Sequence, residues 1–124
     1  MKKTEFNQNN FNSIKWDEEL YKHCKFLNFS IEGKHIESDF INCTFENIEC
    51  YWGLYNMLNF TDCTFKNCTF KGSSFSDCEF VKCQLNNCQF TKDNLDGDCS
   101  FDNTKAYNCK LSNTVGFNVQ ISNA

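Results

Sequence analysis

The sequence predicts a single all-β domain built as a solenoid, and three observations lead to that prediction. A large apolar residue recurs at every fifth position through the middle of the chain, and a small residue, usually cysteine, often stands two positions before it. The chain contains 14 Phe and 10 Cys but no Pro, which is unlike an ordinary globular domain. Its 124 residues are enough for one hydrophobic core, so we expect one domain over residues 1–124.

The five-residue repeat is unbroken from residue 40 to residue 95, and every Phe in that stretch stands on it. A period of five matches neither the 3.6 of a helix nor the 2.0 of a strand. The backbone is therefore expected to turn a corner in each repeat. The repeat positions are Phe40, Phe45, Cys50, Tyr55, Phe60, Phe65, Phe70, Phe75, Phe80, Leu85, Phe90 and Leu95.

The position two before the large residue is the second inward position. We expect its thiols to pack as small hydrophobes in a narrow core. One residue inserted after Leu95 continues the repeat to Ile121, and one residue removed before Phe40 extends it back to Phe6. In the regular stretch this position holds Cys43, Cys63, Cys68, Cys78, Cys83 and Cys88.

The segments CTFKN, CTFKG, CEFVK and CQFTK closely resemble the motif of the pentapeptide-repeat family. That motif has a small residue, a polar residue, Leu or Phe, and two variable positions. The resemblance is strongest over residues 38–114. It implies a right-handed quadrilateral β-helix (β-solenoid) with four pentapeptides per coil. At the spacing of neighbouring strands, roughly five to six coils would form a rod about 30 Å long.

The resemblance also implies that residues about twenty apart stack into core ladders. The expected core ladder residues include Phe40, Phe60 and Phe80, Phe45 and Phe65, Phe70 and Phe90, Phe75, and the thiols Cys43, Cys63, Cys83, Cys68 and Cys88. In full, the four ladders are Tyr21, Phe40, Phe60, Phe80, Phe101, Ile121; Phe6, Phe26, Phe45, Phe65, Leu85, Ala106; Phe11, Ile31, Cys50, Phe70, Phe90, Leu111; and Trp16, Ile36, Tyr55, Phe75, Leu95, Gly116.

Residues 1–37 are less regular than residues 38–123, which form the regular coils. Glu19 and Lys34 fall on inward positions that do not suit a narrow apolar core. Two alternatives follow for this segment, an irregular coil or a short N-terminal capping helix. The helix is favoured by Ser13 as N-cap, by the acids that follow it, and by a near-helical spacing of apolar residues, namely Trp16, Leu20, Cys24 and Leu27.

One coil breaks the rule that outward positions are polar. Tyr51, Trp52, Leu54 and Met57 all fall on outward positions, and such a cluster is a candidate partner-binding site. The alternative is that Gly53 marks a bulge and that the N-terminal segment covers these side chains.

A second and smaller exception lies near the C-terminus, where Val115 and Phe117 also fall on outward positions. A homodimer through the C-terminal end would cover them. The gyrase-protecting members of the family, which this chain resembles, form such homodimers through one end of the solenoid.

The sequence offers little that would support catalysis or metal binding. A straight cysteine ladder supplies collinear thiols instead of the tetrahedral set that zinc needs, and parallel Cβ vectors disfavour disulfides between neighbours. A cysteine-dependent enzyme using Cys24 with His23 or His35 is a minor alternative. No phosphate-binding loop or nucleophile elbow occurs. We therefore expect no enzyme, no metal and no cofactor.

The N-terminal sequence MKKTEFNQNNFNSIKW lacks the apolar run of a signal peptide. No segment approaches the roughly 18 consecutive apolar residues of a membrane span. We therefore expect a cytoplasmic protein that has free thiols and no contact with a membrane. The net charge of −4 argues against direct nucleic-acid binding.

These observations favour a non-catalytic scaffold that binds a protein partner, either a toxin or another enzyme. A bacterial immunity protein or antitoxin that neutralises a toxin is the leading hypothesis. The alternative, which the resemblance implies, is a DNA mimic that regulates DNA gyrase or topoisomerase, as fluoroquinolone-resistance members do. Such a mimic needs a sustained negative face, whereas the acids of this chain are interleaved with lysines.

Overall fold

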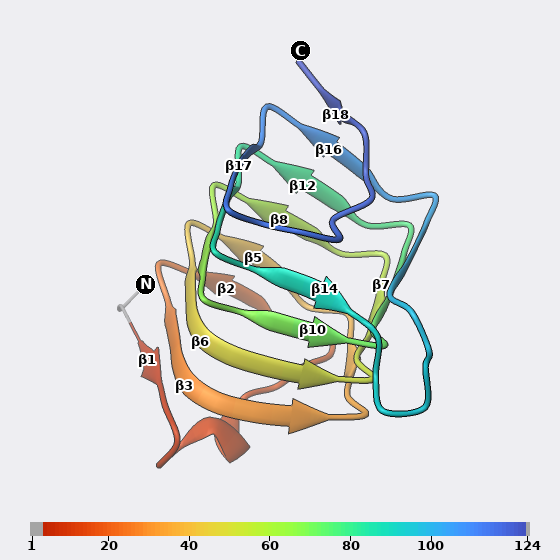
Figure 1. The fold of residues 1–124 in the computed structure, drawn as a ribbon. Coiled ribbons are helices and arrows are strands. Elements are labelled where there is room, and N and C mark those ends of the chain that lie inside the picture. The colour runs from red at the N-terminus through yellow and green to blue at the C-terminus, as the bar shows by residue number, and fades with distance from the viewer. Residues whose placement is uncertain (1–3, 124) are drawn as a thin grey trace.

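The computed structural model describes residues 4–123, which wind into a rod of short parallel strands with a single apolar core (Figure 1). The strands are β1 (Glu5–Phe6), β2 (Leu20–Lys22), β3 (Lys25–Glu32), β4 (His35–Ile36), β5 (Asp39–Ile41), β6 (Thr44–Tyr51), β7 (Leu54–Asn56), β8 (Asn59–Thr61), β9 (Thr64–Lys66), β10 (Thr69–Lys71), β11 (Ser74–Ser76), β12 (Glu79–Val81), β13 (Gln84–Asn86), β14 (Gln89–Thr91), β15 (Ser100–Asp102), β16 (Lys105–Tyr107), β17 (Lys110–Ser112) and β18 (Ile121–Ser122).

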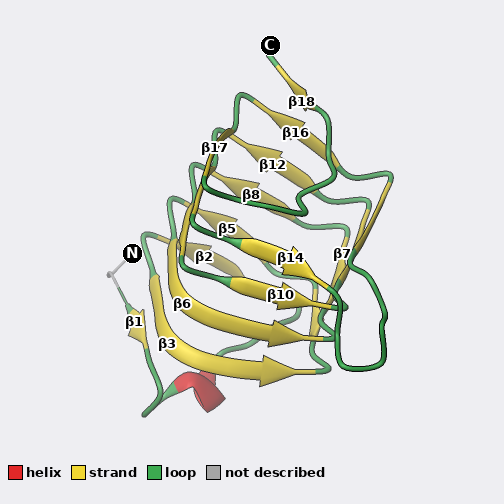
Figure 2. Ribbon diagram, in the orientation of Figure 1, coloured by secondary structure: helices red, strands yellow, loops and turns green. Residues whose placement is uncertain are grey.

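The strands stack along the rod into sheets that cover its four sides. One side is the six-stranded sheet β2-β5-β8-β12-β16-β18, and another is the four-stranded sheet β4-β7-β11-β15. An eight-stranded sheet covers the remaining two sides, because β3 and β6 are long enough to bend around a corner (Figure 2). Beyond the bend, β6 pairs with β10, and β10 pairs with β14.

The all-β solenoid is confirmed, but it is shorter than the predicted five to six coils. One side of the rod carries only the four strands β4, β7, β11 and β15, so the described residues form about four complete turns. At both ends the chain covers some sides and leaves others without a strand.

Each repeat forms a three-residue strand whose central side chain points inward, followed by a corner. The corner residue has a positive φ, and most corner residues are Asn, Asp or Gly, the residue types that tolerate a left-handed backbone. At one corner the asparagines also bond to each other along the rod. Asn87 Nδ2 donates to Asn67 Oδ1 (2.6 Å), and Asn113 Nδ2 donates to Asn87 Oδ1 (2.8 Å). The abundance of Asn therefore follows from the geometry of the corners.

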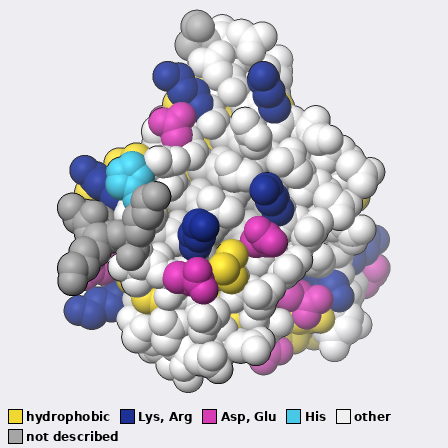
Figure 3. Space-filling model, turned by 90° about the vertical axis from the view of Figure 1, so that its left-hand side faces the viewer, with side chains coloured by type: hydrophobic (Ala, Val, Ile, Leu, Met, Phe, Trp, Pro, Cys, Tyr) yellow, Lys and Arg dark blue, Asp and Glu magenta, His cyan; other side chains and the backbone are white. Residues whose placement is uncertain are grey.

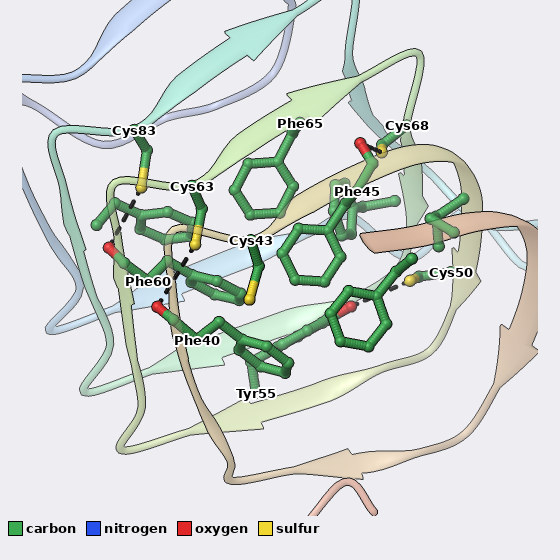
Figure 4. Close-up of a cluster of buried hydrophobic side chains, with 14 of the residues drawn as sticks. Phe40, Cys43, Phe45, Cys50, Tyr55, Phe60, Cys63, Phe65, Cys68 and Cys83 are labelled. Atoms are coloured by element: carbon green, nitrogen blue, oxygen red, sulfur yellow. Dashed lines mark hydrogen bonds between the residues drawn. The ribbon is translucent and has the colours of Figure 1, made fainter. Parts of the chain in front are cut away.

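The core consists of stacked aromatic rings. Phe60 stacks on Phe40 and Phe80 with centroid distances of 5.3 and 4.9 Å, and its edge meets Phe65 at 5.2 Å. Figure 4 shows these columns beside the thiols. Two expected ladder residues near the C-terminal end, Leu95 and Leu111, are exposed, and that part of the prediction is wrong. The expected ladder residues of the regular stretch are buried, namely Phe40, Phe45, Phe60, Phe65, Phe70, Phe75, Phe80, Phe90, Cys43, Cys63, Cys68, Cys83 and Cys88.

The inward cysteines pack against the corners and donate to backbone carbonyls. Cys63 Sγ, for example, lies 3.4 Å from Phe40 O and 3.5 Å from Thr61 O. All ten cysteines are free thiols. The thiol therefore combines the volume of a small hydrophobe with a weak donor for a carbonyl of the preceding coil.

The coil after Phe90 differs from the prediction. We expected one inserted residue after Leu95, but residues 92–99 leave the rod as a loop between β14 and β15 (Figure 1, lower right). Leu95 is 81% exposed. A full repeat and one further residue are thus added, and Phe101, Ala106 and Leu111 each lie one side earlier along the coil than predicted.

This shift corrects the ladders at the C-terminal end. The observed pairs are Phe75 with Phe101, Phe80 with Ala106 and Leu85 with Leu111. The expected pairs of Phe80 with Phe101 and of Leu85 with Ala106 are wrong.

Of the two alternatives for the N-terminal segment, the structure shows the irregular coil and not the capping helix. Among residues 4–123 the single helical segment is a 3-10 turn, η1 (Phe11–Ser13), and Leu20 to Lys22 form β2. Strand β3 brings Phe26 onto Phe45 with a centroid distance of 4.7 Å, and this stacking outweighs the local helix signals. Phe29 stacks on Phe11 at 5.2 Å.

The two charged residues that seemed to point inward do not enter the core. Glu19 and Lys34 are both exposed.

The C-terminal end is closed from within the chain. Phe117 is only 7% exposed, and its ring meets the edges of Phe80 at 5.2 Å and Phe101 at 5.5 Å. The prediction that Phe117 forms part of an outward dimer surface is therefore corrected, because this side chain seals the last coil. Val115 remains 57% exposed.

Candidate functional site

The four predicted partner-binding residues span one side of the rod and its two corners. Tyr51 ends β6, Trp52 forms the next corner, Leu54 begins β7, and Met57 forms the following corner. Trp52, Leu54 and Met57 are 36%, 40% and 72% exposed, and Tyr51 is half-buried. We call these four residues the Trp52 patch.

Two residues of the patch have an unfavourable backbone. Trp52 and Met57 have φ values of 55° and 54°, in the left-handed region that costs an L-residue on the order of 1–2 kcal/mol. Along the corner of Trp52, the preceding and following coils both place glycine, Gly33 and Gly72. The backbone at these corners therefore favours glycine, Asn or Asp over the large side chains of Trp52 and Met57.

Gly53 does not form a bulge. It is buried in an inward position, and its N–H donates to Ser73 Oγ at 3.3 Å. A Cβ at this position would stand 2.9 Å from Tyr55 Cε1, so the close approach of the tyrosine ring requires glycine. The strand that follows pairs in regular register, with Leu54 opposite Ser74.

The side chain that holds Trp52 comes from the 92–99 loop and not from the N-terminal segment. Trp52 Nε1 donates to Asp93 Oδ2 at 2.7 Å. The other carboxylate oxygen, Asp93 Oδ1, accepts the N–H groups of Leu95 and Gly97, both at 2.8 Å. Gly72 leaves space for this carboxylate, because a Cβ there would collide with it. Asp93 thus joins the loop to the patch.

The bonds to Asp93 also change its acidity. The Gly97 N–H, followed by the Trp52 indole and the Leu95 N–H, lowers the pKa of the Asp93 carboxyl below its usual value. The carboxylate is therefore the form in which this junction is held.

A hollow lies beside this junction, and Lys71 spans part of it. Lys71 Nζ donates to Tyr51 Oη at 3.3 Å and lies 5.1 Å from the centroid of the Tyr51 ring. The Tyr51 and Trp52 rings lie 5.8 Å apart at an angle of 53°. The hollow offers both aromatic and charged groups, and it is lined by Glu32, Tyr51, Trp52, Lys71, Lys92, Asp93 and Asn94.

Sequence reasoning missed Lys71 and the loop residues of this site. The break in the five-residue repeat after Leu95 marked the loop, but the repeat contains no information on which corner the loop would meet. Asp93 lies 41 positions from Trp52 in the chain, too far for a local pattern to connect them.

Two of the residues considered for cysteine-dependent chemistry, His23 and Cys24, have other partners. His23 Nδ1 lies 2.8 Å from the Asn42 side-chain amide, and Cys24 Sγ lies 3.3 Å from Lys22 O, to which it donates. Burial raises the pKa of the Cys24 thiol, and it raises the pKa of Cys50 to about 12. Such thiols are poor nucleophiles at neutral pH.

Two common functional features, a metal-binding cluster and a membrane-spanning helix, are absent from the described part of the chain. Residues 4–123 contain no group of three or more His, Cys, Asp or Glu side chains arranged to hold a metal ion. Nor does this range include a helix with the length and apolar character needed to cross a membrane.

The fold and the repeat define a pentapeptide solenoid with one apolar patch on its side. Residues 59–97 match the family model described as "Pentapeptide repeats", in 8 copies. The resemblance to the pentapeptide-repeat family found in the sequence is therefore confirmed over these residues.

Among solved structures, 15 chains match this protein. Two of them are trypsin-treated variants of QnrB1, described as a plasmid-mediated fluoroquinolone resistance protein. One is 16% identical with a TM-score of 0.41, and the match covers 76% of this chain and 54% of that one. The other is 14% identical with a TM-score of 0.35, covering 91% and 56%. The chain thus spans just over half the length of these relatives. No curated protein matches the chain.

Proposed function

We propose that this protein is a non-catalytic scaffold that binds a protein partner through the Trp52 patch. The observation that carries the proposal is the placement of large apolar side chains on left-handed corners, where Trp52 and Met57 stand in place of Asn, Asp or Gly. Exposed aromatic and methionine side chains are typical of binding hot spots.

The energetic cost of the left-handed backbone supports a role in binding, and not in folding, for these side chains. The fold would gain stability from Asn or Gly at the Met57 corner, because these residues carry a smaller left-handed penalty. Strain of this kind is characteristic of functional positions.

The junction with the loop prepares the patch for binding. The bond between Trp52 and Asp93 (2.7 Å) fixes the indole before a partner arrives. A side chain that is already ordered loses less conformational entropy on association. A protein partner would therefore meet a preorganised aromatic anchor.

Within this class, an immunity protein or antitoxin is the specific function we propose. Such a protein needs a rigid surface that covers the active site of a toxin, and the patch on a short solenoid supplies one. The ten free thiols suit a reducing cytoplasm.

The direct test is co-expression with the product of a neighbouring gene that encodes a toxin. We expect the wild-type chain to restore growth and to co-purify with the toxin. Trp52→Ala and Met57→Asn should abolish both effects while the circular dichroism spectrum stays unchanged.

Gln84→Ala, two sides away on β13, is the matched control and should behave as wild type. Full protection by both patch variants would contradict the proposal.

A further inference from the structure

A cavity lies in the N-terminal half of the core, away from the Trp52 patch. Its lining surface is entirely apolar. The volume open to the centre of a water-sized sphere is about 20 Å³, more than the roughly 10–15 Å³ that one water molecule requires. The lining residues that matter for the argument are Trp16, Ile31, Ile36, Ile48, Cys50 and Tyr55.

The cavity exists because Ile31, Cys50 and Ile36 occupy ladder positions that carry aromatic rings in later coils. In one column Ile31 pairs with Cys50, whereas the next coils stack Phe70 on Phe90 with a centroid distance of 4.7 Å. In the adjacent column Ile36 lies opposite Tyr55. Smaller side chains at these levels leave space that rings fill elsewhere in the rod.

The polar groups around the cavity already have partners. Tyr55 Oη donates to Cys50 Sγ at 3.1 Å, as the dashed line in Figure 4 shows. Cys68 Sγ lies 3.3 Å from Phe45 O, to which it donates. The surface that faces the cavity is apolar, so a water molecule inside would lack the two to four polar partners it needs, and apolar cavities of this kind stay dry.

We infer that this cavity is a binding site for one small apolar molecule, of the size of a xenon atom or a short alkane. Such a guest regains the dispersion contacts that the missing rings leave unmade. Trp16, which is half-buried, closes the N-terminal side, and its carbonyl accepts the Glu37 N–H at 2.7 Å. The entrance is therefore through the first coil, where fewer neighbouring strands hold the chain.

Xenon NMR on the whole protein tests this inference. We expect a saturable, protein-dependent shift of the xenon resonance with the wild-type chain. Ile36→Phe places a ring under Tyr55 and should remove the saturable part. Leu85→Phe adds a similar ring at a position that does not line the cavity, and it should bind xenon as wild type does.

Two further variants keep the test decisive. If Ile36→Phe does not fold, Cys50→Leu fills the same space. Ile36→Ala enlarges the cavity and should allow benzene to raise the melting temperature. Absence of a saturable shift in the wild-type protein, or an equal shift in a folded filled variant, would overturn the inference.

Discussion

Residues at the corners of the rod adopt a left-handed backbone, and their side chains decide what each corner does. Asparagine stabilises a corner and bonds to the next coil, as Asn87 does with Asn67. Glycine leaves space, as Gly72 does for Asp93. Trp52 bonds to Asp93 of the 92–99 loop, and both Trp52 and Met57 present apolar surface.

The first prediction concerns the cost of this arrangement. Met57→Asn should raise the free energy of unfolding by about 1 kcal/mol, because Asn tolerates positive φ better than Met. Urea unfolding monitored by circular dichroism measures the change. Leu54→Asn is the control, since Leu54 is equally apolar but lies in a strand with ordinary backbone. A stability loss in Met57→Asn would show that Met57 serves the fold.

The second prediction concerns the thiols. Burial raises the pKa of Cys50 to about 12, so this thiol is almost fully protonated at neutral pH and hidden from solvent. An aromatic disulfide reagent should label the folded protein slowly and all ten thiols rapidly after denaturation. Rapid labelling of Cys50 in the folded state, identified by mass spectrometry, would contradict the buried ladder.

Among the elements, the 92–99 loop differs most from the repeat around it. Its turn is closed by Asp93, whose backbone N–H donates to Gly97 O at 2.9 Å while its carboxylate accepts the Leu95 and Gly97 N–H groups. An ion pair of Lys92 with Asp96 at 3.2 Å is exposed and adds little. The loop thus depends on one carboxylate.

The third prediction follows from that dependence. Asp93→Ala should increase amide hydrogen exchange at Leu95 and Gly97 and alter Trp52 fluorescence. Asp96→Asn removes the ion pair with Lys92 but tolerates the positive φ of this position, and it should leave both nearly unchanged. Nuclear magnetic resonance resolves the two amides. Unchanged protection in Asp93→Ala would mean that other contacts hold the loop.

The same junction should respond to acid. The folded pKa of Asp93 is lowered, so its bonds contribute at pH values above the usual carboxyl range. That contribution is lost as the pH falls through the lowered folded value. Exchange at Gly97 is therefore expected to rise only in strongly acidic solution.

At the scale of the whole molecule, the surface charges are mixed. Figure 3 shows basic and acidic side chains interspersed on one face, with neither sign forming a continuous patch. The net charge is −4 over the whole chain, whereas DNA carries about one negative charge per 1.7 Å of its axis.

The fourth prediction is that the purified protein does not inhibit DNA supercoiling by gyrase at micromolar concentration. The reason is that this surface imitates DNA poorly. Inhibition at that concentration would instead favour the DNA-mimic hypothesis over the Trp52 patch.

The sequence predicted the core well because a five-residue period places each Phe and Cys on a side independently of its neighbours. It could not predict the length of the loop, because one inserted residue and one residue plus a full repeat restore the same period. The N-terminal helix signals were local, and they lost to the stacking of Phe26 on Phe45 from the next coil. The site brings Trp52 together with Asp93 of that loop, so the sequence could not predict this contact either.

The most direct test of the account is a crystal structure that resolves side chains on both sides of the 92–99 loop. We expect Phe60, Phe65, Phe70 and Phe75 inside the rod, Phe101 stacked on Phe75, and Asp93 bonded to Trp52. Density that places these rings in solvent, or that stacks Phe101 on Phe80, would contradict it.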